Sequence, residues 1–359
     1  MRLFHTADLH LRESGEVSLD EQVKVLKQID PKGGMLVVAG DIFDGASSPA
    51  ERNAAIEIFT TWADTAPVVA VRGNHDRPGD VAFLSKLRAK NRIHVTEGFE
   101  FLDTPECLFV LMGWPSRGRV AAWLPEADRI SVDAAATGAV RMLFAGAKVR
   151  AQSAGKPVVF VGHVELGSAT MDSGQPIAGH ADIAIGDDDL LELGADLYCL
   201  GHIHKRQILR NKLVYPGSPR QMSFGESAGH GYVTWEPGGA PQFVDIDSPQ
   251  FVTVNAEWRD GSLVVTSKEF PHAGMNEHYR IVYSVPESDR SQAFESAQAM
   301  VAHVEHCKID PTVTTEAHVR SETIRIAKTP AEKLESYWSS KQRPERAVQI
   351  LAKLNEVQS

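Results

Sequence analysis

Short runs of apolar residues recur along the first two hundred positions of the chain. Met35–Ala39 and Val68–Val71 are continuous and rich in valine, which is typical of buried strands. The segments between such runs read as helices: apolar residues recur at helical spacing in Leu19–Ile29, and Pro49–Trp62 begins with proline in its first turn. Strands and helices that alternate in this way predict a parallel sheet with right-handed crossovers, and therefore an α/β fold.

A polar cluster follows each of five predicted strands. In chain order the clusters are Asp8-Leu9-His10, Gly40-Asp41-Ile42-Phe43-Asp44, Gly73-Asn74-His75-Asp76, Gly162-His163 and Gly201-His202-Ile203-His204. The carboxyl end of a strand is where α/β sheets bind their ligands. One such cluster alone is explained about equally well by turn formation, because Asp and Asn favour turns. Five clusters of the same design indicate a functional site.

The residue types in these clusters are those that bind metal ions. Asp8 and His10 are two residues apart, so on extended backbone their side chains would point the same way and suit one ion. We interpret Asp41 as a carboxylate shared by two ions, and Asn74 offers a neutral carbonyl ligand. Carboxylate, amide and imidazole ligands without thiolate suit Mn²⁺ or another borderline ion, in sites that keep positions open for water.

His75 is interpreted differently, because it follows Asn74 directly and cannot easily bind the same ion. It is therefore free for acid–base catalysis. Asp76, the next residue, is expected to orient the imidazole ring of His75.

The rest of the chain predicts a second, smaller domain. We expect Val252–Trp258 to end the first region and Pro271–Asn276 to be a linker. The elements expected after the linker are the strand Tyr279–Val285, the helix Arg290–Val304, the strand Val319–Ile326 and a helical tail from Pro330. The expected domains are therefore a large first domain at 1–258, a small second domain at 271–328 and a C-terminal helical segment at 329–359.

Composition and charge narrow the class of protein. The chain has 359 residues, of which 43% are hydrophobic and 23% charged, as in ordinary soluble globular proteins. A net charge of −10 argues against a broadly basic nucleic-acid surface, so DNA contacts must come from local patches, metal ions or a partner. The densest early basic stretch, Arg77–Arg92, is either a solvated face or a phosphate contact.

The sequence also indicates a cellular compartment. Its three cysteines lie far apart and form no CxxC pair, which fits the reducing cytoplasm. The first predicted strand begins at Arg2, and no apolar run approaches the length that spans a membrane. We therefore expect a cytoplasmic protein without a signal peptide or membrane segment.

The five clusters, in this order, resemble the motifs of the calcineurin-like metallophosphoesterases. Within that superfamily the chain resembles the SbcD-like nuclease subunits, which act with an SbcC-like ATPase in DNA double-strand-break processing. The segments that carry this resemblance are Ala39–Asp44, Leu200–His204, Tyr215–Pro219 and Ser223–Glu226. Protein phosphatases of the superfamily would show Arg-Gly after Asp44 and glutamate in place of Asp76, whereas here Gly45-Ala46 follows Asp44.

The resemblance implies a four-layer sandwich, with two central sheets flanked by helices, a small α/β cap domain and C-terminal helices. By the same resemblance, 1–258 would be the metallophosphoesterase (nuclease) domain, 271–328 the capping or DNA-recognition domain and 329–359 the ATPase-binding segment. It also implies two divalent metal ions, with Mn²⁺ expected, which would clamp the attacking and leaving oxygens of an in-line displacement. One ion would be held by Asp8, His10, Asp41 and His204, and the other by Asp41, Asn74, His163 and His202. His75 would protonate or hydrogen-bond the leaving oxygen.

The leading functional hypothesis is a metal-dependent DNA nuclease with double-strand exonuclease and single-strand endonuclease activity. By resemblance it is a homodimer whose partners are DNA and an SbcC-like ATPase. The first alternative is a phosphodiesterase or phosphatase of small substrates, which needs the same metal chemistry; a domain after residue 270 favours a polymeric substrate. The second alternative, a catalytically silent scaffold, is disfavoured because every expected ligand and His75 are present.

The predicted tail helices raise a separate question. Thr329, Pro330 and Glu332 are typical of a helix start, and Leu334, Tyr337 and Trp338 would share one face of that helix. A second short helix from Pro344 would also have an apolar face. Helices this short need a surface to pack against. That surface is either the chain's own phosphoesterase domain or the ATPase.

Overall fold

The computed structural model describes residues 1–116, 132–171, 183, 185–226, 229–267, 277–304, 306–314, 329–341 and 343–358. The chain divides into two compact units. The first comprises Met1–Val252 with His272–Arg280, and the second comprises Thr253–Pro271 with Ile281–Ser359.

Two six-stranded sheets form the centre of the first unit. One has the strand order β12-β11-β1-β2-β3-β4, and the other has the order β5-β6-β7-β8-β10-β9. Strands β1 to β4 are parallel to one another, as are β6, β7, β8 and β10. The strands are β1 (Arg2–Thr6), β2 (Gly34–Ala39), β3 (Val68–Val71), β4 (Ile93–Thr96), β11 (Gly231–Trp235) and β12 (Gln242–Asp245) in the first sheet, and β5 (Phe99–Asp103), β6 (Leu108–Met112), β7 (Val158–His163), β8 (Leu197–Gly201), β9 (Gln207–Leu209) and β10 (Leu213–Tyr215) in the second.

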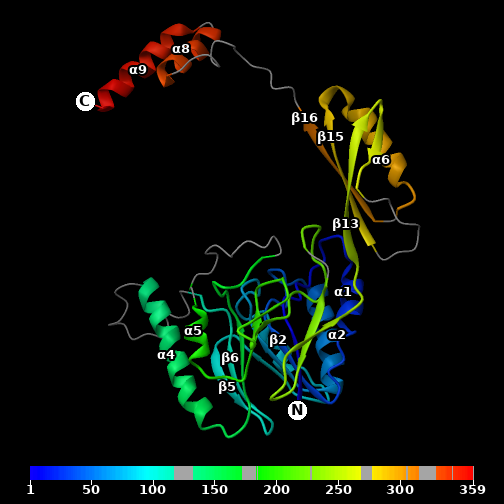
Figure 1. Ribbon diagram of the computed structural model, residues 1–359, viewed down its shortest axis with the longest axis vertical. Coiled ribbons are helices and arrows are strands. Elements are labelled where there is room, and N and C mark those ends of the chain that lie inside the picture. Colours follow the sequence, from blue (N-terminus) through cyan, green and yellow to red (C-terminus); the bar gives the residue numbers. More distant parts are fainter. Residues whose placement is uncertain are drawn as a thin grey trace. The chain divides into compact units, whose positions relative to one another are not determined.

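Helices cover the outer face of each sheet. Figure 1 shows α1 (Leu19–Leu26) and α2 (Pro49–Thr65) outside the first sheet, and α4 (Val132–Gln152) and α5 (Asp187–Leu191) outside the second. A short 3₁₀ helix, η1 (Ala82–Lys86), precedes β4.

Three hydrophobic clusters correspond to these layers. Val37 and Phe109 belong to the core between the sheets, Trp62 to the core under α1 and α2, and Phe144 to the core under α4 and α5. Because the parallel strands are covered on both faces, their sequences are continuously apolar. The predicted four-layer sandwich is confirmed.

The first helices begin where the sequence provides capping residues. The side chains of Ser18 and Ser48 accept the backbone N–H of Glu21 and Glu51, and each glutamate accepts the cap's own N–H in return. Such capping boxes satisfy backbone donors that have no partner inside the helix. Among the described residues, no helix combines the length and apolarity that crossing a bilayer requires.

The second unit has a four-stranded sheet of order β14-β13-β15-β16. Its elements are β13 (Gln250–Arg259), β14 (Ser262–Val265), β15 (Glu277–Pro286), η3 (Glu287–Asp289), α6 (Arg290–Val301) and β16 (Cys307–Thr314). Ile281 and Tyr283 of the sheet pack with Ala293 and Ala297 of α6.

One expected boundary differs from the structure. Val252–Trp258, expected to end the first region, lies in β13, which has buried Val254 and Ala256 and belongs to the four-stranded sheet of the second unit. The expected linker Pro271–Asn276 and the expected strand Val319–Ile326 lie outside the described residues.

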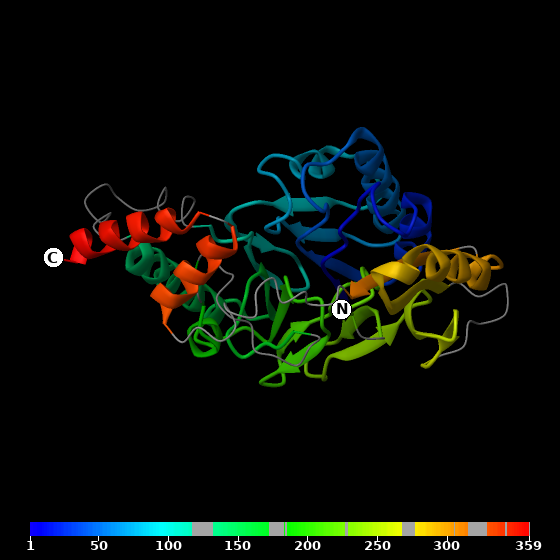
Figure 2. The ribbon, with the colours of Figure 1, turned by 90° about the horizontal axis from the view of Figure 1, so that it is seen from above.

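The tail helices α8 (Pro330–Ser340) and α9 (Pro344–Gln358) pack against each other (Figure 2). The predicted cap is present, because the Thr329 side chain accepts the N–H of Glu332. Ala347 is buried, whereas Tyr337 and Val348 are 45% and 66% exposed. Each helix therefore provides part of the surface that the other needs, and some apolar side chains remain exposed.

The packing of α2 yields a first prediction. The Trp62 side chain is buried, and its indole N–H donates to the Leu26 carbonyl at 3.2 Å. Trp62→Ala should reduce the free energy of unfolding of the first unit by about 3–5 kcal/mol. Trp62→Phe keeps most of the packing and should cost less. Chemical denaturation measures both, and equal losses would show that cavity formation is not the main cost.

Candidate metal centre

The polar ends of five strands meet at one edge of the sandwich. Asp8 and His10 follow β1, Asp41 follows β2, Asn74, His75 and Asp76 follow β3, His163 ends β7, and His202 and His204 follow β8. Close contacts connect eight of these nine residues, whereas the Asp76 side chain contacts the backbone of Phe43 and Gly73. The five clusters thus form a single site, as the shared strand ends predict.

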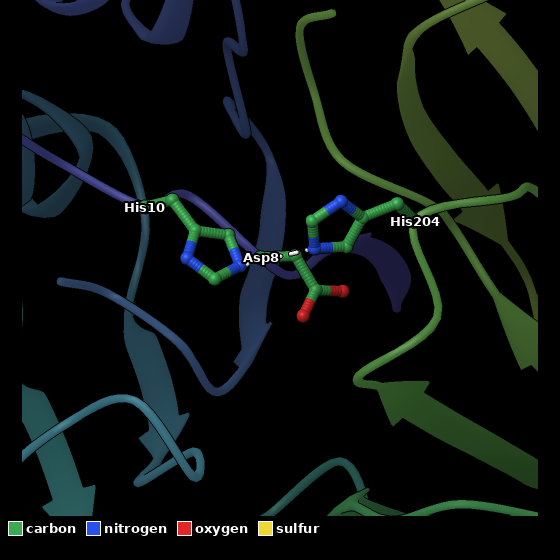
Figure 3. A group of neighbouring side chains, drawn as sticks. All are labelled: Asp8, His10 and His204. Atoms are coloured by element: carbon green, nitrogen blue, oxygen red, sulfur yellow. Dashed lines mark hydrogen bonds between the residues drawn. The ribbon is translucent and has the colours of Figure 1, made fainter. Parts of the chain in front are cut away.

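One group of donors comprises Asp8, His10 and His204, each offering a ligand atom within 4.8 Å of the others. Figure 3 shows the two imidazoles facing each other beside the Asp8 carboxylate, with their Nε2 atoms 3.1 Å apart. The Asp41 Oδ2 atom lies 3.6 Å from the His10 Nε2 atom. Two ring nitrogens that face each other next to carboxylates are the donor set of a cation site.

A second group lies on the other side of Asp41. The Asp41 Oδ2 atom is 3.3 Å from the Nε2 atom of His163. The Asn74 Oδ1 atom lies 2.8 Å from His163 Nε2 and 3.0 Å from His202 Nδ1. Asp8, Asp41 and His163 also offer ligand atoms within 4.8 Å of one another, so Asp8 touches both groups.

The two aspartates are fixed by backbone donors. The N–H of His75 donates to Asp41 Oδ1 at 2.8 Å, which leaves Oδ2 between the two groups. The N–H of His202 donates to Asp8 Oδ1 at 2.9 Å. These hydrogen bonds place one Asp41 oxygen where both donor groups reach it.

An outer oxygen holds the second ring nitrogen of every imidazole in the two groups. The Nδ1 atoms of His10, His163 and His204 lie 3.1, 2.8 and 3.0 Å from Asp44 Oδ1, the Ala39 carbonyl and Glu226 Oε1. In His202 the two ring nitrogens exchange these roles: Nε2 lies 3.3 Å from Glu165 Oε2, and Nδ1 faces Asn74. Such partners fix the tautomer and leave the other nitrogen free for an ion, the arrangement expected of metal-binding histidines.

The sequence analysis gave no role to three of these carboxylates. Asp44 and Glu226 lie in segments that carry the family resemblance, so the sequence drew attention to both residues. It did not indicate which histidine each of them contacts. Glu165 follows His163 by two residues, and no motif pointed to it.

Asp8, His10, Asp41 and His202 have φ angles of 55°, 43°, 51° and 101°. Such angles are uncommon for residues other than glycine and often occur at functional sites. The expectation that Asp8 and His10 lie on extended backbone is therefore wrong. Their N–H groups donate to the carbonyls of Gly40 and Asp41, both at 3.0 Å, and these bonds hold the loop in its curved path.

The glycine in each strand-end motif leaves room for the site. A Cβ atom added at Gly40 would collide with the His163 ring, and one at Gly73 with the Asp41 carboxylate. A Cβ atom at Gly201 would meet the Ala39 carbonyl and the His163 ring. The recurring order of apolar run, glycine and ligand follows from this close approach of loops.

Burial and opposite charge shape the electrostatics. Burial alone would raise the pKa of Asp41, but the neighbouring imidazoles of His163, His10 and His75 hold that pKa below its ordinary value. Burial lowers the pKa of His163, yet the Asp41 carboxylate overcomes this and raises it to about 9. Burial also lowers the pKa of His202 to about 3. The Asp41 carboxylate thus stabilises positive charge next to it. A metal ion bound at His163 would displace the proton of that imidazole.

His75 is paired with Asp44 and not with Asp76. Its Nδ1 atom lies 3.3 Å from Asp44 Oδ1, and Arg12 Nη1 donates to Asp44 Oδ2 at 2.9 Å. The His75 side chain is 45% exposed, so a substrate can reach it. Arg12 and Asp44 therefore hold the imidazole at the open side of the centre.

Asp76 was expected to orient the imidazole ring of His75, but its carboxylate has other partners. Its carboxylate is buried and accepts the N–H groups of Phe43 and Gly73 at 2.8 and 2.9 Å. Burial and the Asp41 charge raise the pKa of Asp76 to about 6. Asp76 ties the loops after β2 and β3 together, because its side chain points into their backbone.

Comparison with known proteins identifies the family of this architecture. The family model of the calcineurin-like phosphoesterases matches residues 1–206, a range that contains all nine residues of the site.

Three curated proteins, each named as the D subunit of the nuclease SbcCD, are similar to the chain. The Bacillus subtilis protein is 28% identical over 255 residues and the Staphylococcus epidermidis protein 23% over 246 residues, covering 63% of each chain in both cases. The Rhodobacter capsulatus protein is 26% identical over 297 residues, with 69% of this chain and 70% of the relative covered. The chain thus spans a little less than two thirds of the first two relatives.

The crowding at Gly73 yields a prediction about the centre. Gly73→Ala would push its Cβ atom into Asp41, so we expect loss of bound divalent metal by elemental analysis and a lower unfolding temperature. Gly98→Ala is the matched control, because its added Cβ meets no atom within 4 Å. Normal metal content in Gly73→Ala would contradict the close packing described for this site.

Proposed function

The chain belongs to the calcineurin-like phosphoesterase family, and from this premise we propose that it is a metal-dependent nuclease that hydrolyses DNA phosphodiester bonds. The observation that carries the proposal is the convergence of two donor groups on Asp41 Oδ2, at 3.6 Å from His10 and 3.3 Å from His163. The relatives named as nuclease subunits support DNA as the substrate. The proposed activities are double-strand exonuclease and single-strand endonuclease, in DNA end processing, repair and recombination.

The proposed cofactor is a pair of Mn²⁺ ions. Asp8, His10, Asp41 and His204 would hold one, and Asp41, Asn74, His163 and His202 the other. Two divalent ions supply positive charge that stabilises the attacking and leaving oxygens of an in-line phosphoryl displacement. The donor set fits this group, because it contains oxygen and imidazole ligands without thiolate.

The chain's own contribution to leaving-group departure is assigned to His75. Its Nδ1 atom faces Asp44, so its Nε2 atom is the one that can donate a proton or a hydrogen bond to the leaving oxygen. Asp44 orients the ring, and Arg12 fixes the Asp44 carboxylate. Asp44 also contacts His10, which links the acid–base residue to the first donor group.

The other parts of the chain receive proposed roles by the same reasoning. We assign hydrolysis to the first unit, DNA recognition to the four-stranded sheet of the second unit, and docking on an SbcC-like ATPase to α8 and α9. The exposed Tyr337 and Val348 side chains support the last assignment. A cytoplasmic homodimer is the proposed assembly.

The second candidate function is a phosphodiesterase or phosphatase of small substrates. The metal centre suits both, because the bond that is cleaved is of the same kind. The second unit favours the polymeric substrate, since a small-molecule enzyme does not require such an appendage.

The proposal is tested by incubating the purified protein with Mn²⁺ and either linear duplex DNA or a chromogenic phosphodiester, with and without an SbcC-like ATPase. The nuclease assignment predicts degradation of DNA. Hydrolysis of the small ester alone, even when the ATPase is present, would contradict the assignment and favour the second candidate.

The role of His75 predicts a separation of catalysis from metal binding. His75→Ala should keep both metal ions and near-normal DNA affinity, while the rate of hydrolysis falls by about 10²–10⁴-fold. Glu236→Ala is the control, because Glu236 is exposed in the turn between β11 and β12, at the end of the first sheet opposite the centre. Loss of metal from His75→Ala would show that His75 is a ligand.

The role of the tail predicts a separation of partner binding from catalysis. Deletion of residues 330 to 359 should leave metal binding and hydrolysis of small or single-stranded substrates largely intact. It should abolish co-purification with the ATPase and ATP-stimulated digestion of duplex ends. The full-length variant with Tyr337→Asp and Val348→Asp should share the binding defect, because both side chains are exposed. If the deletion lowers the unfolding temperature and the ATPase still binds, the tail belongs to the protein's own core.

A further inference from the structure

A cationic cavity lies at the edge of the first sheet opposite the metal centre. Residues 85–95 line it, and its volume is about 450 Å³. The site residues follow the carboxyl ends of β1, β2 and β3, whereas this segment precedes the amino end of the parallel strand β4. The Val68 N–H donates to the Arg92 carbonyl at 3.0 Å, which places the segment beside the start of β3.

Four cations on this segment are exposed, and the residues between them are partly buried. The cations, hereafter the 86–92 cation cluster, are Lys86, Arg88, Lys90 and Arg92. Leu87 and Ala89 pack against the core under α2. The backbone and side-chain N–H groups of Asn91 both donate to the Ala63 carbonyl at 2.9 Å. The fold therefore anchors alternate residues and displays the cations outward.

The 86–92 cation cluster is not neutralised by carboxylates at ion-pair distance. Among the described residues, the ion pairs of lysine and arginine side chains all involve other positions. His94, which also lines the cavity, is paired with Glu100. In a chain with a net charge of −10, four adjacent unpaired cations form a local anion-attracting site.

We propose that the 86–92 cation cluster binds the phosphate backbone of nucleic acid, at a second site that takes no part in hydrolysis. The cations occupy every second position from 86 to 92 and alternate with partly buried residues, so they follow one another along the chain, which suits a row of phosphates better than one compact anion. No aromatic ring other than His94 lines the cavity among the described residues, so base stacking contributes little. The contact is therefore sequence-independent, as backbone contacts are.

The choice of nucleic acid as the polyanion rests on the proposed nuclease function. The distance to the centre separates the two roles. Val68 begins β3 and Asn74 follows its end, so the length of the strand Val68–Val71, roughly 10 Å at about 3.3 Å per residue, lies between the segment and the centre. Phosphates bound at the cluster therefore lie at the opposite end of β3 from the bond being cleaved. The cluster raises the affinity for nucleic acid and its salt dependence, and not the rate at which a bound phosphodiester is hydrolysed.

The test uses the full chain with Lys86→Gln, Arg88→Gln, Lys90→Gln and Arg92→Gln combined. Binding to labelled duplex and single-stranded DNA is measured in EDTA over a series of KCl concentrations, so the result does not depend on cleavage. For duplex DNA the slope of log affinity against log salt should fall in magnitude by about three, and affinity at low salt at least about tenfold. The double variants Lys86→Gln/Arg88→Gln and Lys90→Gln/Arg92→Gln should each show about half the slope change.

The matched control removes the same charge from exposed positions elsewhere in the first unit, with Lys24→Gln, Lys148→Gln, Arg150→Gln and Arg210→Gln combined. The proposal predicts a much smaller change for it, and unchanged Mn²⁺-dependent hydrolysis of a small phosphodiester for both variants. Equal losses in the two variants would overturn the proposal and leave the nuclease assignment intact. Loss of binding that coincides with dissociation of a dimer in sedimentation would assign the cluster to a subunit interface and also overturn it. DNA binding without any DNA hydrolysis by the unmodified protein would instead count against the nuclease assignment alone.

Discussion

The centre depends on the position of one buried carboxylate, that of Asp41. Its Oδ1 atom is held by the N–H of His75 at 2.8 Å, and its Oδ2 atom lies between His10 and His163. This position requires a φ angle of 51° at Asp41 and the absence of a side chain at Gly73. The sandwich provides both, because β1, β2 and β3 end side by side and β7 and β8 bring their histidines from the facing sheet.

The oxygen atoms around the imidazoles complete the site. Asp44, Glu226, Glu165 and the Ala39 carbonyl each hold one ring nitrogen and so direct the other inward. Asp44 has a further role, because it contacts both His10 and His75. The geometry of His75, the proposed acid–base residue, and that of the first donor group are thereby coupled through the Asp44 side chain.

Much of this arrangement could be predicted from the sequence. The apolar runs indicated the buried strands, the order of the motifs indicated the sandwich, and Thr329 with Glu332 indicated the start of α8. The set of histidines, aspartates and asparagine that converges was also predictable, because carboxyl ends of parallel strands share one edge of a sheet.

The remaining features depend on contacts between distant segments. Glu226 meets His204 across a loop, and no local pattern announces a partner so far along the chain. The direction of the Asp76 side chain depends on backbone donors of Phe43 and Gly73 and not on its neighbour His75. Strand β13 belongs to the four-stranded sheet of the second unit, and its Ala256 packs in the cluster under α6. The sequence signalled a boundary more strongly at the later stretch Pro271–Asn276, which contains proline and glycine.

The central claim, that Asp41 serves two ions at once, is tested most directly by counting bound metal. The protein is loaded with Mn²⁺, freed of excess metal by gel filtration and analysed for metal per chain, beside Asp41→Ala and the exposed-site control Asp64→Ala. The account predicts two ions per chain in the unmodified protein and the control, and loss of both ions and of hydrolysis in Asp41→Ala. An Asp41→Ala variant that loses one ion and still hydrolyses phosphodiesters would contradict it.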